Sequence, residues 1–215
     1  MTDEASLRER LVAAVRKLDS VGMNRGSTGN LSHRRGDGML ITPTGMGADD
    51  LGASDLVWLG DDGTLRGQWK PSSEWHFHRA IYRARPDLNA VVHAHSIHAT
   101  ALACLRRALP AFHYMVAVAG GDSVPCTPYH TFGTESLSRD VAAAFTERKA
   151  CLMANHGLVA GGTTLADAMK VAIEIESLCE VYLKALAVGE PAILSAAQMS
   201  RVAAKFRRYG KAAAA

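Results

Sequence analysis

The sequence lacks the features that mark several specialised classes of protein. Its four cysteines include no C-x-x-C pair, so we expect reduced thiols rather than a disulfide scaffold. No apolar run approaches the roughly 18 residues of a membrane span, and the acidic start at Asp3 and Glu4 does not resemble a secretory leader. We therefore expect a cytoplasmic protein that does not associate with a membrane.

The sequence also has little excess of charge of either sign. Its 24 Lys and Arg residues against 21 Asp and Glu residues leave a formal net charge of +3. This excess is too small to indicate a nucleic-acid partner, which normally requires a clustered basic face. Hydrophobic residues make up 48% of the chain and charged residues 21%, as is typical of globular proteins. A length of 215 residues suits one domain, predicted here over residues 1–215.

Patterns of apolar residues predict a chain that mixes helices and strands. Leu7, Leu11 and Leu18 recur at helical spacing near the start, and short apolar runs further on indicate strands. Few segments form clean βαβ units, so we predict an α/β fold in which helices cover both faces of a mixed sheet. Helices are predicted over residues 4–20, 73–85, 97–105, 134–148, 164–189 and 195–209, and strands over residues 29–33, 39–41, 55–59, 64–67, 89–94, 114–118 and 151–154.

Histidines carry the strongest chemical signal. His93 and His95 lie two residues apart at the end of a predicted strand, where side chains i and i+2 point to the same face. His156 follows the predicted buried strand 151–154, so a third imidazole lies at the end of a strand. Zinc binds imidazole nitrogen, and catalytic zinc sites keep three protein ligands. A histidine of this kind can instead pack in the core or lie on the surface, which is how we interpret His33, His76, His78, His98, His113 and His130.

Glu74 is the carboxylate that could accompany these histidines. It lies at the start of a predicted helix, behind Ser72 and Ser73, where the helix dipole favours an anion. Glu74 could simply stabilise its own helix. Alternatively, Glu74 and His78 form an i, i+4 pair that could bind a metal along the helix.

Three segments rich in small and hydroxyl residues suit an oxyanion. They are residues 26–30, 42–45 and 71–73, and the third opens a helix. None matches a Walker P-loop or a Rossmann fingerprint. Each is an ordinary turn when taken alone, but together they favour a phosphorylated small molecule held mostly by neutral donors.

These motifs, taken in order, resemble the class II aldolase/adducin family. The matching pieces are Gly-Ser-Thr-Gly-Asn-Leu-Ser at 26–32, Ile-Thr-Pro-Thr-Gly-Met at 41–46, Pro-Ser-Ser-Glu-Trp at 71–75, Val-Val-His-Ala-His-Ser at 91–96, His-Tyr-Met-Val-Ala-Val-Ala-Gly-Gly at 113–121, Thr-Phe-Gly-Thr at 131–134 and Asn-His-Gly-Leu at 155–158. The resemblance implies a three-layer α/β/α sandwich around a mixed, largely antiparallel sheet. It also implies a homotetramer with active sites between subunits and a C-terminal tail, from about residue 200, near the active site.

The resemblance also implies roles for individual residues. Glu74, His93, His95 and His156 would bind one zinc ion, with Mn²⁺ or Co²⁺ as alternatives. Glu74 would then act as the general base, and Tyr114 would donate a proton to the aldehyde oxygen. Phosphate-binding residues would be Gly29, Asn30, Thr44, Gly45, Ser72 and Ser73, while Phe132 and Tyr209 would line the aldehyde end of the site.

The implied reaction is the cleavage of a ketose 1-phosphate, such as L-fuculose 1-phosphate, into dihydroxyacetone phosphate and an aldehyde such as L-lactaldehyde. A substrate such as 5-deoxyribulose or 5-methylthioribulose 1-phosphate fits the same expectation. Related enzymes with other activities are an L-ribulose-5-phosphate 4-epimerase, which resembles a variant with Asp in place of Glu74, and a methylthioribulose-1-phosphate dehydratase. A non-enzymatic adducin-like module is expected to lack the complete metal set, which is present here.

Overall fold

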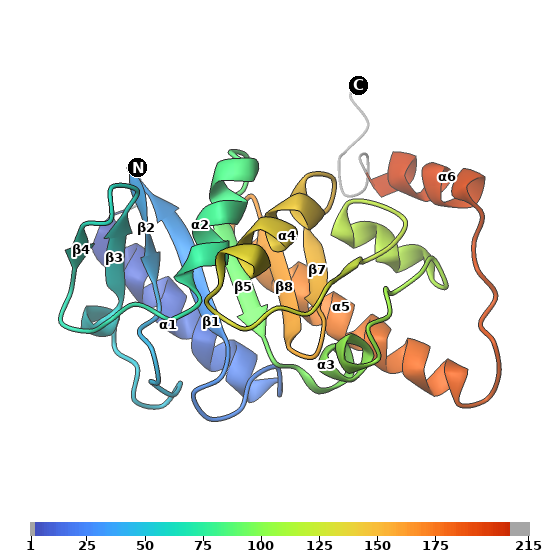
Figure 1. Cartoon of the computed structure of the whole chain (residues 1–215), viewed down its shortest axis with the longest axis horizontal. Helices are drawn as coiled ribbons and strands as arrows, with labels where there is room; N and C mark the ends of the chain where they lie inside the picture. The colour runs from blue at the N-terminus through green and yellow to red at the C-terminus, as the bar shows by residue number, and fades with distance from the viewer. Residues whose placement is uncertain (1–2, 207–215) are drawn as a thin grey trace, which may run out of the picture.

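A single eight-stranded sheet forms the centre of the molecule. The computed structural model describes residues 3–206, and its strands run in the order β4-β3-β2-β1-β5-β8-β7-β6 (Figure 1). All neighbouring strands in this order are antiparallel except β6 and β7, which confirms the mixed, largely antiparallel sheet. The strands are β1 (Asn30–Arg35), β2 (Gly38–Ile41), β3 (Val57–Gly60), β4 (Leu65–Arg66), β5 (Ala90–Ala94), β6 (Cys126–Thr127), β7 (Ala150–Met153) and β8 (Gly157–Gly162).

Helices cover both faces of this sheet, as predicted. On one face pack α1 (Glu4–Ser20), α3 (Ile97–Cys104) and α5 (Leu165–Leu186), and on the other pack α2 (Trp75–Ala84) and α4 (Glu135–Phe145). Figure 1 shows α2 and α4 in front of the sheet and α1 and α5 behind it. The last described helix, α6 (Ala196–Phe206), lies beside the 3-10 helix η2 (Tyr114–Ala119). No helix within residues 3–206 combines the length and apolar character needed to cross a bilayer.

The alternation of side chains along the central strands decides which face each residue serves. In β5, Val92 packs with the α1, α3 and α5 layer, while Val91 packs with the α2 and α4 layer. His93 therefore points toward α2. In β1, Leu31 packs with the first layer, so Asn30 and Ser32 also face α2.

Several predicted boundaries held because capping residues set them. The Thr134 side chain accepts a hydrogen bond from the Leu137 backbone at the start of α4, and Thr164 does the same for Asp167 at the start of α5. Such bonds satisfy N–H groups that have no partner inside the helix. The predicted start of α2 at residue 73 was wrong, because the helix begins at Trp75.

Other elements differ from the predictions. The predicted strand over residues 114–118 is the 3-10 helix η2, which the His113 side chain caps by accepting a hydrogen bond from the Met115 backbone. Gly120 ends η2 with a positive φ of 89°, a conformation that strands do not use. The short strand β6, the 3-10 helix η1 (Ala53–Asp55) and the long strand β8 were not predicted.

Candidate metal centre

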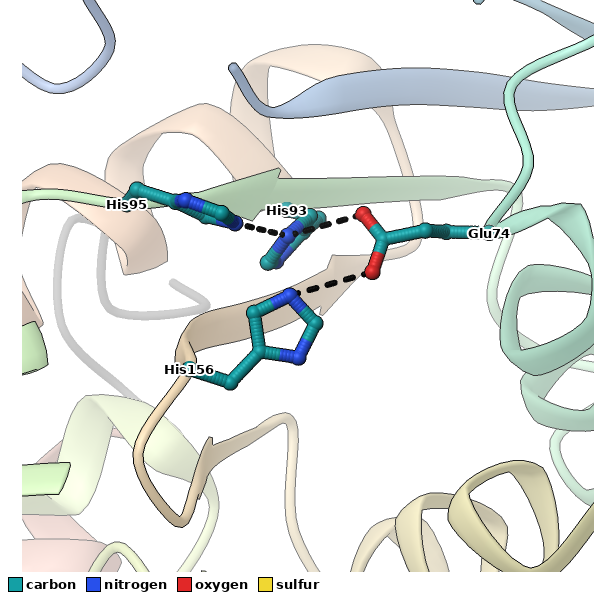
Figure 2. Close-up of side chains that lie close together, drawn as sticks. All are labelled: Glu74, His93, His95 and His156. Carbon is teal, nitrogen blue, oxygen red and sulfur yellow. Dashed lines mark hydrogen bonds and ion pairs between the residues drawn. The ribbon is translucent and has the colours of Figure 1, made fainter. Parts of the chain in front are cut away.

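Four side chains from three distant segments converge on one point. Glu74 precedes α2, His93 lies in β5, His95 follows β5, and His156 lies in the turn between β7 and β8. Their ligand atoms all lie within 4.8 Å of one another. In Figure 2 the rings of His93 and His156 lie against the carboxylate of Glu74, and the ring of His95 points toward His93. The structure thus brings together all four residues predicted as metal ligands.

The orientation of His93 leaves one ring nitrogen for a ligand. His93 is fully buried, and its Nδ1 lies 2.9 Å from the carbonyl oxygen of Leu158, which can only accept a hydrogen bond. Nδ1 therefore carries the hydrogen, and Nε2 presents its lone pair to the cluster. This Nε2 lies 2.9 Å from Nε2 of His95 and 3.1 Å from Oε2 of Glu74. Because two ring nitrogens and a carboxylate oxygen crowd together here, the arrangement suits a shared cation.

The turn that carries His156 depends on its two neighbours. Asn155 has a positive φ of 54°, and its side chain accepts a hydrogen bond from Nε of Arg106 at 2.9 Å. At Gly157 the backbone passes so close to β5 that a Cβ atom would lie 2.5 Å from the carbonyl oxygen of Ala94. We expected Gly157 to make the sharp turn, but the left-handed residue is Asn155, and Gly157 provides the close approach.

Glu74 is the N-cap residue of α2 and is 8% exposed. Its Oε2 accepts a hydrogen bond from Nδ2 of Asn30 at 2.9 Å. Its Oε1 lies 3.0 Å from Nε2 of His156 but has no hydrogen bond of good geometry, although it is buried. A buried carboxylate oxygen without a well-aligned partner is costly, so this atom suits a cation ligand.

The electrostatics of the cluster favour the ionised form of Glu74. Burial alone raises the pKa of the Glu74 carboxyl, but His93 and His156 outweigh burial and hold that pKa well below its usual value. Burial opposes the charged form of His93, yet Glu74 outweighs this effect and raises the His93 pKa. Burial, with His93 and His156, lowers the pKa of His95 to about 4. At neutral pH the His95 imidazole is therefore neutral and the Glu74 carboxylate is ionised, the states in which both could bind a metal.

The donor set fits a small divalent metal. Zinc–nitrogen bonds of about 2.0–2.1 Å place the ligand atoms of a tetrahedral site roughly 3.4 Å apart. The close pairs in this cluster, at 2.9 to 3.1 Å, need only small movements to reach that spacing. Three imidazoles and one carboxylate suit zinc and its transition-metal neighbours better than magnesium or calcium, which prefer oxygen ligands.

A cavity of about 340 Å³ opens beside these ligands. Glu74, His95 and His156 line this cavity, and so does Phe132. The cavity is also lined by all six residues predicted to bind phosphate, which are Gly29, Asn30, Thr44, Gly45, Ser72 and Ser73. Among the described residues that line the cavity, none is Lys or Arg, so the donors that its small-residue loops present are hydroxyl, amide and backbone N–H groups. The N-terminus of α2 adds the positive end of its dipole.

Some lining residues were not predicted. They are Ser27, Thr28, Pro43, Tyr129, His130 and Asn155. Ser27 and Thr28 lie inside the segment 26–30, whose composition predicted an oxyanion site, so that segment already pointed to them. The ion pair between His130 and Asp140, with 2.8 Å between Nε2 and Oδ2, joins residues that no motif connects.

Tyr114, Tyr209 and His78 are not among the described residues that form the cavity or the metal cluster. Tyr114 is exposed on η2 and is not among the residues that line the cavity. Tyr209 lies outside the described residues. The alternative metal pair of Glu74 and His78 is wrong, because the His78 ring contacts Asn30 and Ser32 instead of joining the cluster.

Comparison with known proteins agrees with the geometry. A protein of Rhodospirillum rubrum named 5-methylthioribulose-1-phosphate/5-deoxyribulose-1-phosphate aldolase is 52% identical over 205 residues, which cover 95% of this chain and 93% of that protein. The L-fuculose phosphate aldolase of Escherichia coli K12 is 45% identical over 205 residues, which cover 95% of each chain. A solved structure of an L-fuculose 1-phosphate aldolase superposes with a TM-score of 0.91 at 38% identity, covering 94% of this chain and 96% of that one.

The relatives are named aldolases, which are lyases, and class II aldolases depend on a metal. Residues 9–183 match the Class II Aldolase and Adducin N-terminal domain. The chain therefore belongs to the class II aldolase and adducin family, and it is an enzyme of the aldolase type.

Proposed function

We propose that this enzyme uses zinc to cleave a ketose 1-phosphate into dihydroxyacetone phosphate and an aldehyde. One observation carries the proposal: a single cavity is lined both by the histidine and glutamate cluster and by the three small-residue loops. A sugar phosphate needs both features, because its phosphate must be held while its carbonyl end reacts. The names of the relatives support a phosphorylated sugar as the substrate class.

The phosphate end is the non-reacting end of such a substrate. Hydroxyl groups of Thr44, Ser72 and Ser73, and backbone N–H groups near Gly29 and Gly45, are the proposed donors. Binding energy gained at the phosphate orients the reacting carbon atoms beside Glu74. No Lys or Arg is among the described residues that line the cavity, so the charge of the phosphate is neutralised only in part. The phosphate can therefore leave as part of dihydroxyacetone phosphate.

The reaction requires charge stabilisation and two proton transfers. When bound, a divalent cation supplies Lewis-acid stabilisation of the negative charge that bond cleavage leaves on the dihydroxyacetone phosphate fragment. In cleavage, a base takes the proton of the hydroxyl that becomes the aldehyde oxygen. The carbon–carbon bond then breaks, and its electron pair stays on the dihydroxyacetone phosphate fragment. Glu74 takes up a proton from solvent and passes it to that carbon, while the base returns its proton to solvent; general acid–base help of this kind is typically worth about 10²- to 10⁴-fold.

Tyr114 is the proposed group at the aldehyde oxygen. Because it lies outside the cavity lining of its own chain, we propose that Tyr114 of a partner subunit completes the site. Its exposed ring and the neighbouring Phe206, whose ring centroid lies 6.4 Å away, are available to a second copy. A homotetramer with sites between subunits is part of this proposal.

The candidate substrates differ in the aldehyde that cleavage releases. L-fuculose 1-phosphate is our first candidate, and 5-deoxyribulose or 5-methylthioribulose 1-phosphate is the second, favoured by the 52% identity to the Rhodospirillum rubrum protein. Tyr129 and Phe132 are exposed aromatic residues at the cavity, and they offer an apolar surface to a methyl or methylthio group.

A coupled assay tests the proposal. The zinc-loaded enzyme is given each of the three ketose 1-phosphates in turn, and dihydroxyacetone phosphate is measured as it forms. We expect release of dihydroxyacetone phosphate from at least one of them, and the kcat/KM values rank the aldehydes. An enzyme that releases none but inverts a carbon of L-ribulose 5-phosphate would be an epimerase, and the proposed cleavage would be wrong.

A further inference from the structure

A chain of hydrogen bonds runs from Glu74 into the core between the sheet and α2. Beyond the Asn30 amide, the Asn30 Oδ1 lies 2.5 Å from Nε2 of His78. Nδ1 of His78 lies 2.7 Å from the Ser32 hydroxyl, which lies 2.8 Å from the Tyr82 hydroxyl. All five side chains are buried, and His78 and Ser32 are fully inaccessible. The cleavage reaction described above makes no use of His78, Ser32 or Tyr82.

The hydrogen atoms in this chain have only one consistent arrangement. An ionised Glu74 can only accept, so Asn30 must turn its NH₂ group toward Oε2 and its carbonyl oxygen toward His78. Nε2 of His78 must then carry the hydrogen. Burial, together with His93, lowers the pKa of His78 to about 3, so this ring is neutral and its Nδ1 accepts from Ser32. With its own hydrogen on His78, Ser32 accepts from Tyr82 at 2.8 Å, which is shorter than the 3.5 Å from the Tyr82 hydroxyl to the carbonyl oxygen of Asn89.

The same contacts divide the two oxygens of Glu74 between different tasks. Oε2 accepts a hydrogen bond from Asn30 and lies 3.1 Å from Nε2 of His93, whereas the buried Oε1 lies 3.0 Å from Nε2 of His156 and has no well-aligned hydrogen bond. If the Asn30 amide were reversed, its carbonyl oxygen would face a carboxylate oxygen at hydrogen-bonding distance, and the two acceptors would repel each other. The direction of the Asn30 amide therefore decides whether Glu74 stays among the three imidazoles.

We propose that His78 is a positioning residue that fixes the Asn30 amide and thereby holds Glu74 with Oε1 free for the cation and the proton. The inference rests on the proposed roles of Glu74 as metal ligand and base. Within the described residues, His78 neither lines the cavity nor belongs to the metal cluster. Its effect passes through one donated hydrogen bond, so a side chain that donates at the same place can replace it.

Two substitutions of His78 separate hydrogen bonding from packing. His78→Phe keeps a ring of similar size but removes the donor, whereas His78→Gln keeps an N–H donor near the position of Nε2. Zinc affinity of the metal-free protein is measured by competition with a chromogenic chelator. We expect His78→Phe to weaken zinc binding by about 10-fold, because loss of a residue that supports a metal ligand typically costs 10- to 100-fold in affinity. We expect His78→Gln to bind zinc almost as tightly as the wild type. Equal zinc affinity in folded His78→Phe and wild type, or equal impairment in both variants, would overturn the proposal.

A kinetic readout and a control variant sharpen this test. We expect His78→Phe to slow proton exchange at dihydroxyacetone phosphate mainly through kcat, with a smaller change in KM, because Asn30 is the one predicted phosphate-binding residue that His78 contacts. Tyr82→Phe removes the hydroxyl at the far end of the chain and leaves His78 in place. It is expected to lower thermal stability without changing zinc affinity. A loss of zinc affinity in Tyr82→Phe as large as in His78→Phe would indicate general loosening of α2, and the proposal would fail.

A measurement on the unaltered protein avoids any question of folding. Nitrogen-15 NMR of the zinc-loaded wild type is expected to show His78 as the neutral tautomer with hydrogen on Nε2. Hydrogen on Nδ1 would place the Asn30 amide the other way round and refute the inference. The absence of dihydroxyacetone phosphate formation would refute the proposed function alone, because zinc competition and NMR would still decide on His78.

Discussion

Asn30 and His93 face each other across the antiparallel pair of β1 and β5, and both contact Oε2 of Glu74. One contact is a neutral amide donor at 2.9 Å, and the other is an imidazole nitrogen at 3.1 Å. Two neighbouring strands therefore hold the carboxylate that the start of α2 supplies. The cluster is built on rigid elements, which keeps its ligand geometry well defined.

Loss of His95 should abolish zinc binding at this site. We expect His95→Ala to bind zinc at least about 100-fold more weakly, since loss of a partner outside the ligand shell already costs 10- to 100-fold. Turnover should fall to background. Metal content after gel filtration, measured by atomic absorption, checks this. His76→Ala is the matched control, because His76 stacks on Trp75 away from the cluster and should leave zinc content unchanged.

Glu74→Gln should separate metal binding from proton transfer. The amide oxygen of glutamine remains a possible ligand, so we expect part of the zinc to be retained. An amide has no basic oxygen at neutral pH, so proton exchange at dihydroxyacetone phosphate should be lost. Exchange of the C–H proton into deuterated water, followed by NMR, is the measurement. Exchange at the wild-type rate would show that Glu74 is not the base.

Gly157→Ala should disturb the site without changing any ligand. The added Cβ would lie 2.5 Å from the Ala94 carbonyl oxygen, so β5 and β8 must separate slightly. Such overpacking typically costs about 1–3 kcal/mol in the free energy of unfolding, and it displaces His156 from the cluster. Thermal melts with and without zinc should show a lower Tm and a smaller zinc-induced increase. Gly189→Ala, where the added atom meets nothing within 4 Å, should melt like wild type.

Acid should destabilise the protein partly through His78. Its pKa is lowered by burial from 6.5 to about 3 in the folded state. Below pH 6.5 the unfolded chain therefore binds a proton that the folded chain does not, so the free energy of unfolding falls as the pH decreases. One such site contributes up to about 1.4 kcal/mol per pH unit.

His78→Gln has no titrating ring, so its loss of stability toward acid should be shallower. Denaturant unfolding of both proteins without metal, from about pH 7 to about pH 5, measures the two slopes. Parallel slopes would mean that His78 binds its proton equally well in the folded protein.

Removal of the metal should lower thermal stability reversibly. Chelation leaves the buried Oε1 of Glu74 without a well-aligned partner and three imidazoles crowded around the carboxylate. Free zinc at 100 times its Kd should restore about 2.7 kcal/mol. Magnesium at the same concentration should restore little, because it prefers oxygen ligands. Equal recovery with magnesium would contradict the assignment of an imidazole-rich site.

The local patterns that predicted the site are those that depend on a single strand or loop. The two-residue spacing of His93 and His95 predicted that their side chains share a face, and the composition of the small-residue loops predicted a phosphate site. His156 was a candidate because it follows a buried strand, and Glu74 because it begins a predicted helix; the resemblance to a family then implied that both bind the metal. Helices were predicted because capping by Thr134 and Thr164 and apolar spacing are local properties.

The features that were missed depend on contacts between distant residues. β8 was not predicted because Gly157, Gly161 and Gly162 give it the composition of a loop. Close packing nevertheless requires these glycines, because an added Cβ would meet β5 at Gly157, Phe145 of α4 at Gly161 and α5 at Gly162. His78 was interpreted as a packing or surface residue, because its partners Asn30 and Ser32 lie 48 and 46 positions away in the sequence. No periodicity reveals such a pairing.

The position of the cluster has a consequence for how the protein reaches its active form. Its residues come from the start of α2, the end of β5 and the turn into β8. A folding intermediate in which β5 and β8 are not yet paired therefore does not bring the complete set of metal-binding side chains together. Pairing shifted by a single residue would turn the His93 ring to the opposite side of the sheet. Metal capture during refolding therefore reports that the central strands have joined in their native alignment.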